Sequence, residues 1–361
     1  MILDFIANIN EENFIFFTIF FSTIISYLTC YFLRKISKLF KIEKLPSERG
    51  QHKQPIFHLG GISFITGTFI FFFLIFHLNK NLFDSNIFNN NLIIISICSF
   101  ILFITGLIDD LKDLSPFPRL LIMSSTSMII WSQNIRFPEL INIDLNISNF
   151  NVFLSNTFSQ ILTLLWIVGI VNAINWLDGL DGLAVGVSLL ISIGLFFINL
   201  INNQIDYSIF ALSIIGSCIG FLFHNKYPAK MFMGDNGSYF LGFSLSTLAL
   251  LSAKDITNNN NNLIPIFLLF AVPVFDMARV ILTRIFKKKS PFYPDRSHIH
   301  HFLLDKNFNH PMTVLIIYYL TNFSLSITLL LTSYKFGILW ILISNIFLFI
   351  ISKKIKKSKF T

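Results

Sequence analysis

Two carboxylates stand between long apolar segments in the stretch 172–184, NAINWLDGLDGLA. Asp178 and Asp181 are each followed by a glycine, which allows positive φ and close approach of the backbone to a ligand. An acid at the end of a membrane span is costly and usually faces a polar cavity. Two asparagines, Asn172 and Asn175, precede the acids. The stretch therefore predicts a ligand-binding loop rather than a simple polar turn between two spans.

A second pair of acids, Asp109 and Asp110, stands at the end of another apolar segment, in the loop 109–116. Adjacent like charges repel, so keeping both ionised at a membrane edge calls for a cation. Oxygen-only ligands suit Mg²⁺ or Mn²⁺ better than zinc. The alternative is that one acid has a raised pKa and acts as a base. Asp113, one turn later, is the weaker candidate because it is equally explained as a residue on a helix surface.

A further acid, Asp235, is flanked by glycines in the segment 224–238, HNKYPAKMFMGDNGS. Small residues around a carboxylate leave room for a metal ion and its phosphate ligand. Asn225 and Phe232 belong to the same segment. Phe232 is either ordinary packing or a face on which a base stacks, and the sequence alone favours packing.

Three histidines, His298, His300 and His301, follow Arg296 in the long segment 283–312. A histidine cluster first suggests zinc, but no cysteine accompanies it. Histidine with arginine also suits a diphosphate, whose spread negative charge needs several donors. The segment therefore predicts either a zinc site or a diphosphate site, and the absence of a cysteine is an argument against zinc.

The loop 34–58 is basic and ends close to the glycine pair at 60–61. His52 and Lys53 lie in it beside a proline, and such a cluster suits a phosphate. From composition alone, a basic anchor on the cytoplasmic side explains the loop equally well.

The composition is that of a polytopic membrane protein, since 54% of the 361 residues are hydrophobic and 13% are charged. About 20 apolar residues are enough to cross a bilayer. Eleven segments qualify: 14–33, 59–78, 92–108, 117–133, 157–174, 183–201, 207–223, 237–252, 263–282, 313–332 and 336–352. We expect an all-α integral membrane protein with about 11 transmembrane helices, formed as a single domain by residues 1–361. Cys30, Cys98 and Cys218 all lie in these spans without motif spacing, so we expect them to fill the core.

The placement of the 27 basic residues predicts the orientation, because short loops rich in Lys and Arg face the cytoplasm. With eleven spans, all but four of them fall on one side. The exceptions are Lys80, Arg136, Lys254 and Lys335. We therefore expect the N-terminus outside and the C-terminus in the cytoplasm. Anionic lipid headgroups explain the basic C-terminal tail, so no nucleic acid partner is expected.

Every motif suited to chemistry falls on the basic side, in the loops 34–58, 109–116, 172–184, 224–238 and 283–312. Random polar turns would be shared between both faces of the membrane. One cytoplasmic active site that holds a metal and phosphates suggests phosphoryl transfer between a soluble nucleotide donor and a lipid acceptor. No P-loop, kinase or Rossmann glycine pattern is present in the sequence.

A polytopic transporter is the rival interpretation from another class, and Asp276 inside the span 263–282 would serve it. We expect Asp276 to pair with Arg279 one turn on or with another polar residue. A transporter predicts acids at the midplane and an inverted repeat, whereas here the acids gather at one surface. A CDP-alcohol phosphotransferase is a second rival, but its signature has Ala-Arg soon after Asp-Gly, where this chain has Leu183-Ala184.

The sequence resembles the polyprenyl-phosphate N-acetylhexosamine-1-phosphate transferases, the WecA/MraY-type enzymes, nearly from end to end. The resemblance rests on six motifs: HKQPIFHLGG at 52–61, IDD at 108–110, NAINWLDGLDGLA at 172–184, MFMGDNGS at 231–238, VPVFD at 272–276 and SPFYPDRSHIHH at 290–301. Ile299 interrupts the three-histidine run of the MurNAc-pentapeptide branch, so the WecA-like branch with GlcNAc-type donors is the closer match.

The resemblance implies a reaction in which a UDP-N-acetylhexosamine and undecaprenyl phosphate give undecaprenyl-diphosphate-sugar and UMP, with Mg²⁺ or Mn²⁺ as cofactor. It also implies a multi-pass protein of the bacterial inner (plasma) membrane, with a homodimer as a possible assembly. The metal ligands are expected to be Asp235 and Asp109. The catalytic residues are expected to be Asp109, Asp110, Asp181 and His300. The substrate-binding residues are expected to be Asn175, Asp178, Asn225, Phe232, Arg296, His298, His301, His52 and Lys53.

One departure concerns the first motif. Where the family commonly has Pro-Arg, this chain has Phe57-His58. A phosphate contact from that arginine is therefore missing, and His52 or Lys53 is expected to replace it.

Overall fold

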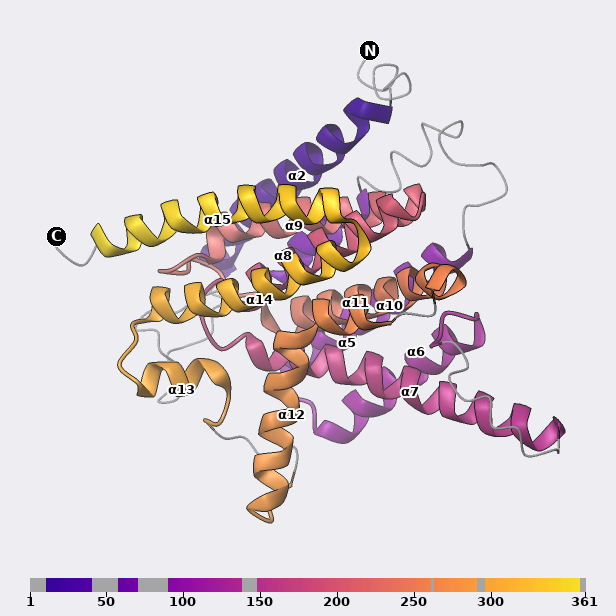
Figure 1. Ribbon diagram of the computed structural model, residues 1–361. Helices are drawn as coiled ribbons and strands as arrows, with labels where there is room; N and C mark the ends of the chain where they lie inside the picture. The colour runs from indigo at the N-terminus through magenta and orange to yellow at the C-terminus, as the bar shows by residue number, and fades with distance from the viewer. Residues whose placement is uncertain are drawn as a thin grey trace.

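The computed structural model describes residues 11–40, 58–70, 90–137, 148–260, 263–290 and 296–357. Within these ranges every regular element is a helix and no strand is present (Figure 1). The elements are α2 (Glu11–Phe40), α3 (Gly61–Ile65), the π-helix η1 (Thr66–Ile70), α5 (Asn90–Lys112), α6 (Pro116–Ser132), α7 (Ser148–Leu177), α8 (Leu183–Ile201), α9 (Ile205–Asn225), α10 (Gly234–Asn260), α11 (Ile264–Leu269), α12 (Ala271–Phe286), α13 (Ile299–Asp305), α14 (His310–Thr332) and α15 (Tyr334–Lys357). The all-α expectation is confirmed for the described part of the chain.

Six described helices are long and apolar enough to cross a membrane: α2, α5, α7, α8, α9 and α14. The chain thus has the make-up of a multi-pass membrane protein. Each of the eleven expected spans overlaps a helix, although the end of the segment 59–78 lies outside the described residues. The count of eleven and the orientation stay predictions.

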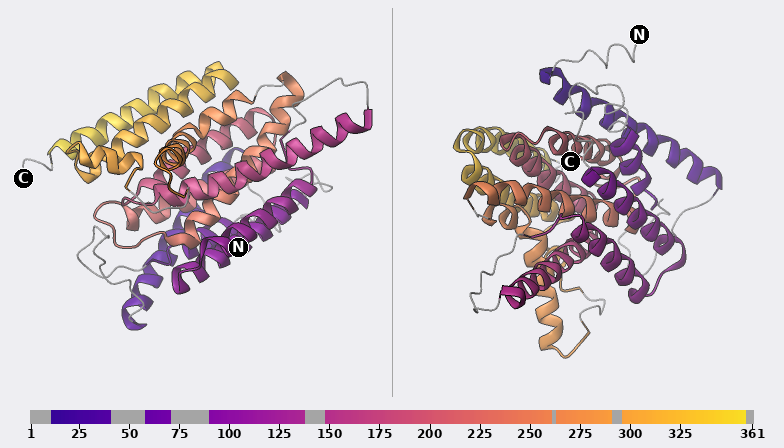
Figure 2. Two further views of the ribbon diagram at one scale, coloured as in Figure 1. Left: turned by 90° about the horizontal axis from the view of Figure 1, so that it is seen from below. Right: turned by 90° about the vertical axis from the view of Figure 1, so that its right-hand side faces the viewer.

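The expected span 263–282 is two helices, α11 and α12, which meet at Phe270. Pro273 explains the break, because its ring lacks an N–H and clashes with the carbonyl four residues earlier, which is that of Leu269, the last residue of α11. Beyond the break α12 points away from the other helices and projects from the bundle (Figure 1). Figure 2 shows the same projection from the side, with α14 and α15 paired along one edge of the molecule.

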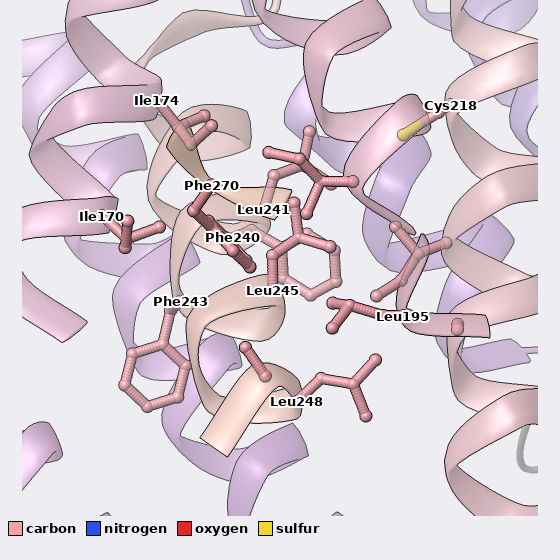
Figure 3. Close-up of a cluster of buried hydrophobic side chains, with 14 of the residues drawn as sticks. Ile170, Ile174, Leu195, Cys218, Phe240, Leu241, Phe243, Leu245, Leu248 and Phe270 are labelled. Atoms are coloured by element: carbon pink, nitrogen blue, oxygen red, sulfur yellow. The ribbon is translucent and has the colours of Figure 1, made fainter. Parts of the chain in front are cut away.

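Helix α10 supplies a large part of the core. Its Phe240, Leu241, Phe243, Leu245 and Leu248 are fully buried. In Figure 3 they lie among Ile170 and Ile174 of α7, Leu195 of α8 and Phe270. A side chain in place of Gly242 would lie 2.7 Å from the Val171 backbone, so the glycine lets α7 and α10 pack closely.

Buried hydroxyl groups in α10 bond to the preceding turn of the same helix. Thr247 donates to the Phe243 carbonyl at 2.8 Å, and Ser252 donates to the Leu248 carbonyl at 2.9 Å. Such bonds satisfy polar groups where no water reaches them. The three cysteines are buried and free, as expected.

Candidate active site

A cavity of about 330 Å³ lies where the ends of several helices meet. Its walls come from α6, α7, the loop after α7, α10, α12 and the histidine segment, residues 298–301. The lining residues are Pro116, Arg119, Leu120, Met123, Asn172, Asn175, Trp176, Asp178, Gly179, Tyr239, Arg284, His298, His300 and His301. Acidic, basic and aromatic groups from distant parts of the sequence therefore share one chamber.

Asp110 binds the start of α10. Its Oδ1 accepts the Asp235 N–H at 3.0 Å, and its Oδ2 accepts the Asn236 N–H at 3.0 Å and the Asn236 amide. The first N–H groups of a helix have no partner within it, and a carboxylate there also meets the positive end of the helix dipole. A side chain in place of Gly106 would lie 2.5 Å from the backbone of Asp235, so this glycine brings α5 and α10 together. Asp110 thus fixes where Asp235 lies.

Asp109 is buried, with 4% of its surface exposed, and it accepts three hydrogen bonds. Its Oδ1 accepts the Leu114 N–H at 2.8 Å. Its Oδ2 accepts from Arg119 Nη1 at 2.8 Å and from the Tyr239 hydroxyl at 2.8 Å. Arg119 and Tyr239 line the cavity, and Asp109 lies behind them.

Asp235 lies in the first turn of α10, close to the cavity wall. Asn175 donates to its Oδ1 at 2.6 Å and to the Ser238 hydroxyl at 3.0 Å. Burial and the neighbouring carboxylates of Asp110 and Asp109 raise the pKa of Asp235 to about 7. A cation that bound beside this carboxylate would favour its ionised form.

Asp178 is the acid that lines the cavity directly. Among the described residues, no hydrogen bond to its carboxylate is present. Burial, together with the charges of Asp235, Asp110 and Asp181, raises the pKa of Asp178 well above its ordinary value. Asp178 is the clearest candidate to meet a ligand.

The loop 178–182, between α7 and α8, carries Asp178 and is held by groups from other parts of the chain. The Asp181 N–H donates to His310 Nε2 at 3.1 Å, and the Asp181 carboxylate accepts the Ala229 N–H at 2.9 Å. The Tyr318 hydroxyl donates to the Gly182 carbonyl at 2.5 Å. Gly182 has φ +77°, a conformation that a residue with a side chain rarely adopts. Asp181 therefore faces the neighbouring loop and is absent from the cavity lining.

Asn225 joins two loops instead of facing the cavity. Its Oδ1 accepts the Gly182 N–H at 2.9 Å, and its Nδ2 donates to the Met231 carbonyl at 2.9 Å. The side chain is buried, with 1% exposed, and both polar atoms are used by backbone groups. It positions the loop that carries Asp178.

Asp276 in α12 fixes the histidine segment. Its carboxylate accepts from His298 Nδ1 at 2.9 Å, from the Ile299 N–H at 2.7 Å and from Arg279 at 3.1 Å. The expected pairing of Asp276 with Arg279 is confirmed, and His298 and Ile299 are further partners. These bonds bring the segment against the cavity.

The histidine rings stack along the cavity wall. His298 and His300 are parallel, with ring centroids 5.7 Å apart, and His301 lies 4.3 Å from His300. His300 packs so closely on Gly179 that a side chain there would clash with the ring. Burial and the neighbouring His301 and His298 lower the pKa of His300 to about 3, so it is neutral at physiological pH.

Of the remaining expected site residues, Arg296 and Phe232 are absent from the cavity lining, and two others are not described by the structure. Arg296 is 70% exposed and pairs with Asp305 at 3.8 Å. Phe232 is half-buried, and its carbonyl accepts the Gly60 N–H at 3.0 Å. His52 and Lys53 lie outside the described residues. The roles of all four stay predictions.

The structure also places residues in the cavity that sequence reasoning missed, namely Arg119, Arg284, Trp176 and Tyr239. Arg284 is buried, and its guanidinium lies 5.1 Å from the centre of the Trp176 ring. The available signal for Arg119 was a cation within the apolar segment 117–133, where it needs a partner or a ligand, whereas Arg284 falls in the loop 283–312, just beyond an expected span.

The donor set suits a divalent metal ion. The described residues contain no ready-made group of three metal-ligating side chains. Mg²⁺, however, is commonly held by one or two carboxylates together with substrate phosphates and water. Asp178 and Asp235 offer two such carboxylates, and burial together with neighbouring carboxylates raises the pKa of each, which a bound cation would oppose. Asn175 adds an amide beside them.

A helical membrane protein whose cavity combines a carboxylate, that of Asp178, with arginines and histidines has the make-up of an enzyme that handles phosphate groups. Comparison with known proteins agrees. The glycosyl transferase family 4 matches residues 92–253, which include Asp109, Asp110, Asp178 and Asp235.

Curated relatives match over most of their length. The "Probable undecaprenyl-phosphate N-acetylglucosaminyl 1-phosphate transferase" of Bacillus subtilis is 33% identical over 92% of this chain and 89% of the relative. The "Undecaprenyl-phosphate alpha-N-acetylglucosaminyl 1-phosphate transferase" of Pasteurella multocida is 32% identical over 77% of this chain and 76% of the relative. The "Decaprenyl-phosphate N-acetylglucosaminephosphotransferase" of Mycobacterium leprae is 30% identical over 82% of this chain and 78% of the relative. The chain belongs to glycosyl transferase family 4 and is a transferase.

Proposed function

We propose that this protein transfers N-acetylhexosamine 1-phosphate, in the first place GlcNAc 1-phosphate, from a UDP-sugar to undecaprenyl phosphate and releases UMP. The observation that carries the proposal is the cavity itself, in which Asp178 stands among Arg119, Arg284 and the histidines. The printed names of the relatives, which specify GlcNAc 1-phosphate and a polyprenyl phosphate, agree with it.

In this reaction an oxygen of the lipid phosphate attacks the β-phosphorus of the UDP-sugar. A new P–O bond forms to the lipid phosphate, the bond between the β-phosphorus and the bridging oxygen breaks, and UMP leaves with that oxygen. A lipid phosphate is already largely ionised at neutral pH, so attack in a single displacement needs little help from a base. The cost of bringing two anions together is the main barrier for the protein to lower.

The basic residues of the cavity suit this task. Arg119 and Arg284 come from different helices and keep their charge throughout. His300 is neutral, so it offers one N–H donor and one acceptor nitrogen rather than a charge. We assign the arginines and histidines to the phosphate groups and the sugar.

Asp178, Asp235 and Asn175 would hold Mg²⁺ or Mn²⁺. Such an ion supplies positive charge at the donor diphosphate when bound. The expectation that Asp109 is a further metal ligand stays a prediction, as do the catalytic roles of Asp110 and Asp181. Both of these last two carboxylates bind backbone N–H groups, which favours a positioning role for them.

The proposal includes eleven spans in a bacterial inner membrane, with the N-terminus outside. The active site would then face the cytoplasm, where UDP-sugars are made. Arginine and lysine in the loops of one side support this orientation. A homodimer is the proposed assembly, to be tested by mass measurement in detergent.

The experiment is a transfer assay with purified protein in detergent, undecaprenyl phosphate, Mg²⁺ and a panel of UDP-sugars, following UMP release. We expect release with UDP-GlcNAc and its loss in EDTA and in Asp235→Asn. Release with a different UDP-N-acetylhexosamine alone would keep the reaction and change the sugar. No release with any donor, from protein whose thermal unfolding is cooperative, would overturn the proposal.

A further inference from the structure

Asp109 is built into a hydrogen-bonded group of three side chains that come from three helices. Arg119 Nη1 and the Tyr239 hydroxyl both donate to its Oδ2 at 2.8 Å, and the two donors are 3.4 Å apart. The other oxygen accepts the Leu114 N–H at 2.8 Å. All three contacts are of a length expected for strong hydrogen bonds.

The three side chains differ in their access to the cavity. Arg119 and Tyr239 line the cavity, whereas Asp109 is absent from the lining and only 4% exposed. Each of its oxygens accepts from a protein donor, and its further neighbour is the Asp235 carboxyl group. A proton acceptor or a metal ligand would instead need a lone pair that reaches the substrate or the ion.

Arg119 is the member of the group that a substrate can touch. Its side chain is 28% exposed, and one of its nitrogens is engaged by Asp109. A guanidinium carries five N–H donors in a fixed plane, so further donors remain for an anion. An arginine in such a position is long and mobile unless other groups fix it, and fixing it in advance lowers the cost of binding.

Tyr239 connects this group to the acidic side of the cavity. It follows Asp235 by four residues, so both side chains lie on the same face of α10. The Tyr239 ring is buried, with 2% exposed, and its hydroxyl reaches Asp109. One helix therefore fixes both Asp235 and the orientation of Arg119.

We infer that Asp109 and Tyr239 are positioning residues that hold the Arg119 guanidinium at the cavity wall to bind a phosphate group of a substrate. The inference rests on the proposed function and deepens it. It gives Asp109 a role different from the base or metal ligand that the sequence suggests. The phosphate belongs to the lipid acceptor or to the donor diphosphate.

The test is a double-mutant cycle in the transfer assay with Asp109→Asn, Arg119→Gln and the double variant. We expect each single variant to lower kcat/KM by about 10-fold or more, since each breaks a charge-assisted hydrogen bond. In the Arg119→Gln background, Asp109→Asn should cost less than about 3-fold further, because its role is already lost. A full, multiplied loss in the double variant would overturn the inference.

A binding measurement separates positioning from metal ligation without relying on turnover. Mn²⁺ titration of the purified protein, followed by electron paramagnetic resonance, should show a much smaller change of affinity for Asp109→Asn than for Asp235→Asn, because Asp109 acts on the ion only through its charge beside Asp235. Asp235→Asn serves as the variant that should weaken binding. An equal weakening in Asp109→Asn would make Asp109 a metal ligand and overturn the inference.

Tyr239→Phe keeps the ring and removes only the hydroxyl, so it tests the group if Asp109→Asn does not fold. We expect kcat/KM to fall by about 5-fold, mainly through a higher KM for one substrate. A rise for undecaprenyl phosphate assigns Arg119 to the acceptor, and a rise for the UDP-sugar assigns it to the donor. An unchanged kcat/KM would contradict the role of Tyr239. Wild-type protein without any transfer would defeat the proposed function, whereas active wild type with a multiplied Asp109→Asn loss defeats only this inference.

Discussion

Two pairs of acids lie at the ends of apolar helices, and they differ in their hydrogen bonds. One pair is Asp109 and Asp110, and the other is Asp178 and Asp181. Asp109 and Asp110 together accept hydrogen bonds from Arg119, Tyr239 and the first residues of α10. In the other pair, Asp181 accepts a backbone N–H, while Asp178 faces the cavity. The same pattern in the sequence thus gives three acids whose carboxylates accept hydrogen bonds from the protein and one whose carboxylate has no such bond among the described residues.

The comparison teaches that burial alone does not identify a reacting acid. Asp109 is more buried than Asp178, yet its oxygens are satisfied by protein donors. A buried polar group that is fully bonded contributes to structure, and one that is not bonded needs a ligand. The four acids can be separated by experiments that measure activity and stability together.

The largest effect is expected for Asp178→Asn. We expect transfer activity to fall at least about 100-fold, because a residue that contacts the reacting groups supplies interactions present only in the transition state. The thermal midpoint in metal-free buffer should hold or rise, since a repelled charge is removed. Single-turnover rates and differential scanning fluorimetry measure the two quantities. A stable variant with near-normal turnover would remove Asp178 from the reacting centre.

Asp110→Asn should clearly lower stability, in contrast to Asp178→Asn, which should leave stability unchanged or raise it. The new amide nitrogen would face the N–H groups of Asp235 and Asn236, and loss of such a cap costs about 1–2 kcal/mol. We expect a lower thermal midpoint together with lower activity. Asp113→Asn is the matched control, because Asp113 is an exposed residue of the same helix end. If both variants unfolded at the same temperature, the capping role of Asp110 would be wrong.

His310 tests whether the loop that carries Asp178 depends on its supports. His310→Gln keeps an acceptor for the Asp181 N–H, whereas His310→Phe keeps a ring to pack on Tyr227 and has no acceptor. We expect about 10-fold lower kcat/KM in the Phe variant and substantial recovery in the Gln variant. Equal activity of the two variants would show that the hydrogen bond does not position the loop.

A pH-dependent difference in stability is expected between wild type and Asp235→Asn without metal. The pKa of Asp235 is about 7 in the folded protein and ordinarily 3.8. A raised pKa means that the folded state keeps its proton longer, so the stabilisation is full below about pH 4 and is lost as pH rises to about 7. Asp235→Asn should therefore gain stability relative to wild type from pH 4.5 to 7.5.

The stability difference between the two proteins at each pH removes the contribution of groups that titrate equally in both, such as His300. Thermal midpoints in EDTA give the difference, and added Mg²⁺ should stabilise wild type more than the variant at pH 7.5. A difference that stays constant with pH would contradict the raised pKa of Asp235.

Much of the fold follows from local features of the sequence. Apolar segments of membrane-spanning length predicted helices, and every regular element among the described residues is a helix. The free, buried cysteines and the Asp276–Arg279 pair were also predicted correctly. The division of 263–282 was missed, although Pro273 carried the signal, because hydropathy averaged over a span does not register one absent N–H.

The site was predicted less completely, and the reason is physical. Residue types and glycines pointed to loops of which some supply cavity residues, but a role depends on which lone pairs other groups already use. Tyr239 lies 130 positions from Asp109, and His310 lies 129 positions from Asp181. No local pattern reveals such partners, so Asn225 and Asp181 were expected to bind substrate or act in catalysis, while the structure places them between loops.

The most direct test of the central claim is to follow the β-phosphorus. Purified protein would be given undecaprenyl phosphate, Mg²⁺ and UDP-GlcNAc labelled with ³²P at the β-position. Sugar-1-phosphate transfer predicts that the label enters the lipid phase in step with UMP release, and that neither occurs with Asp178→Asn. Label that stays in water-soluble UDP while the sugar enters the lipid would mean that the C1–O bond breaks instead, and would contradict the account.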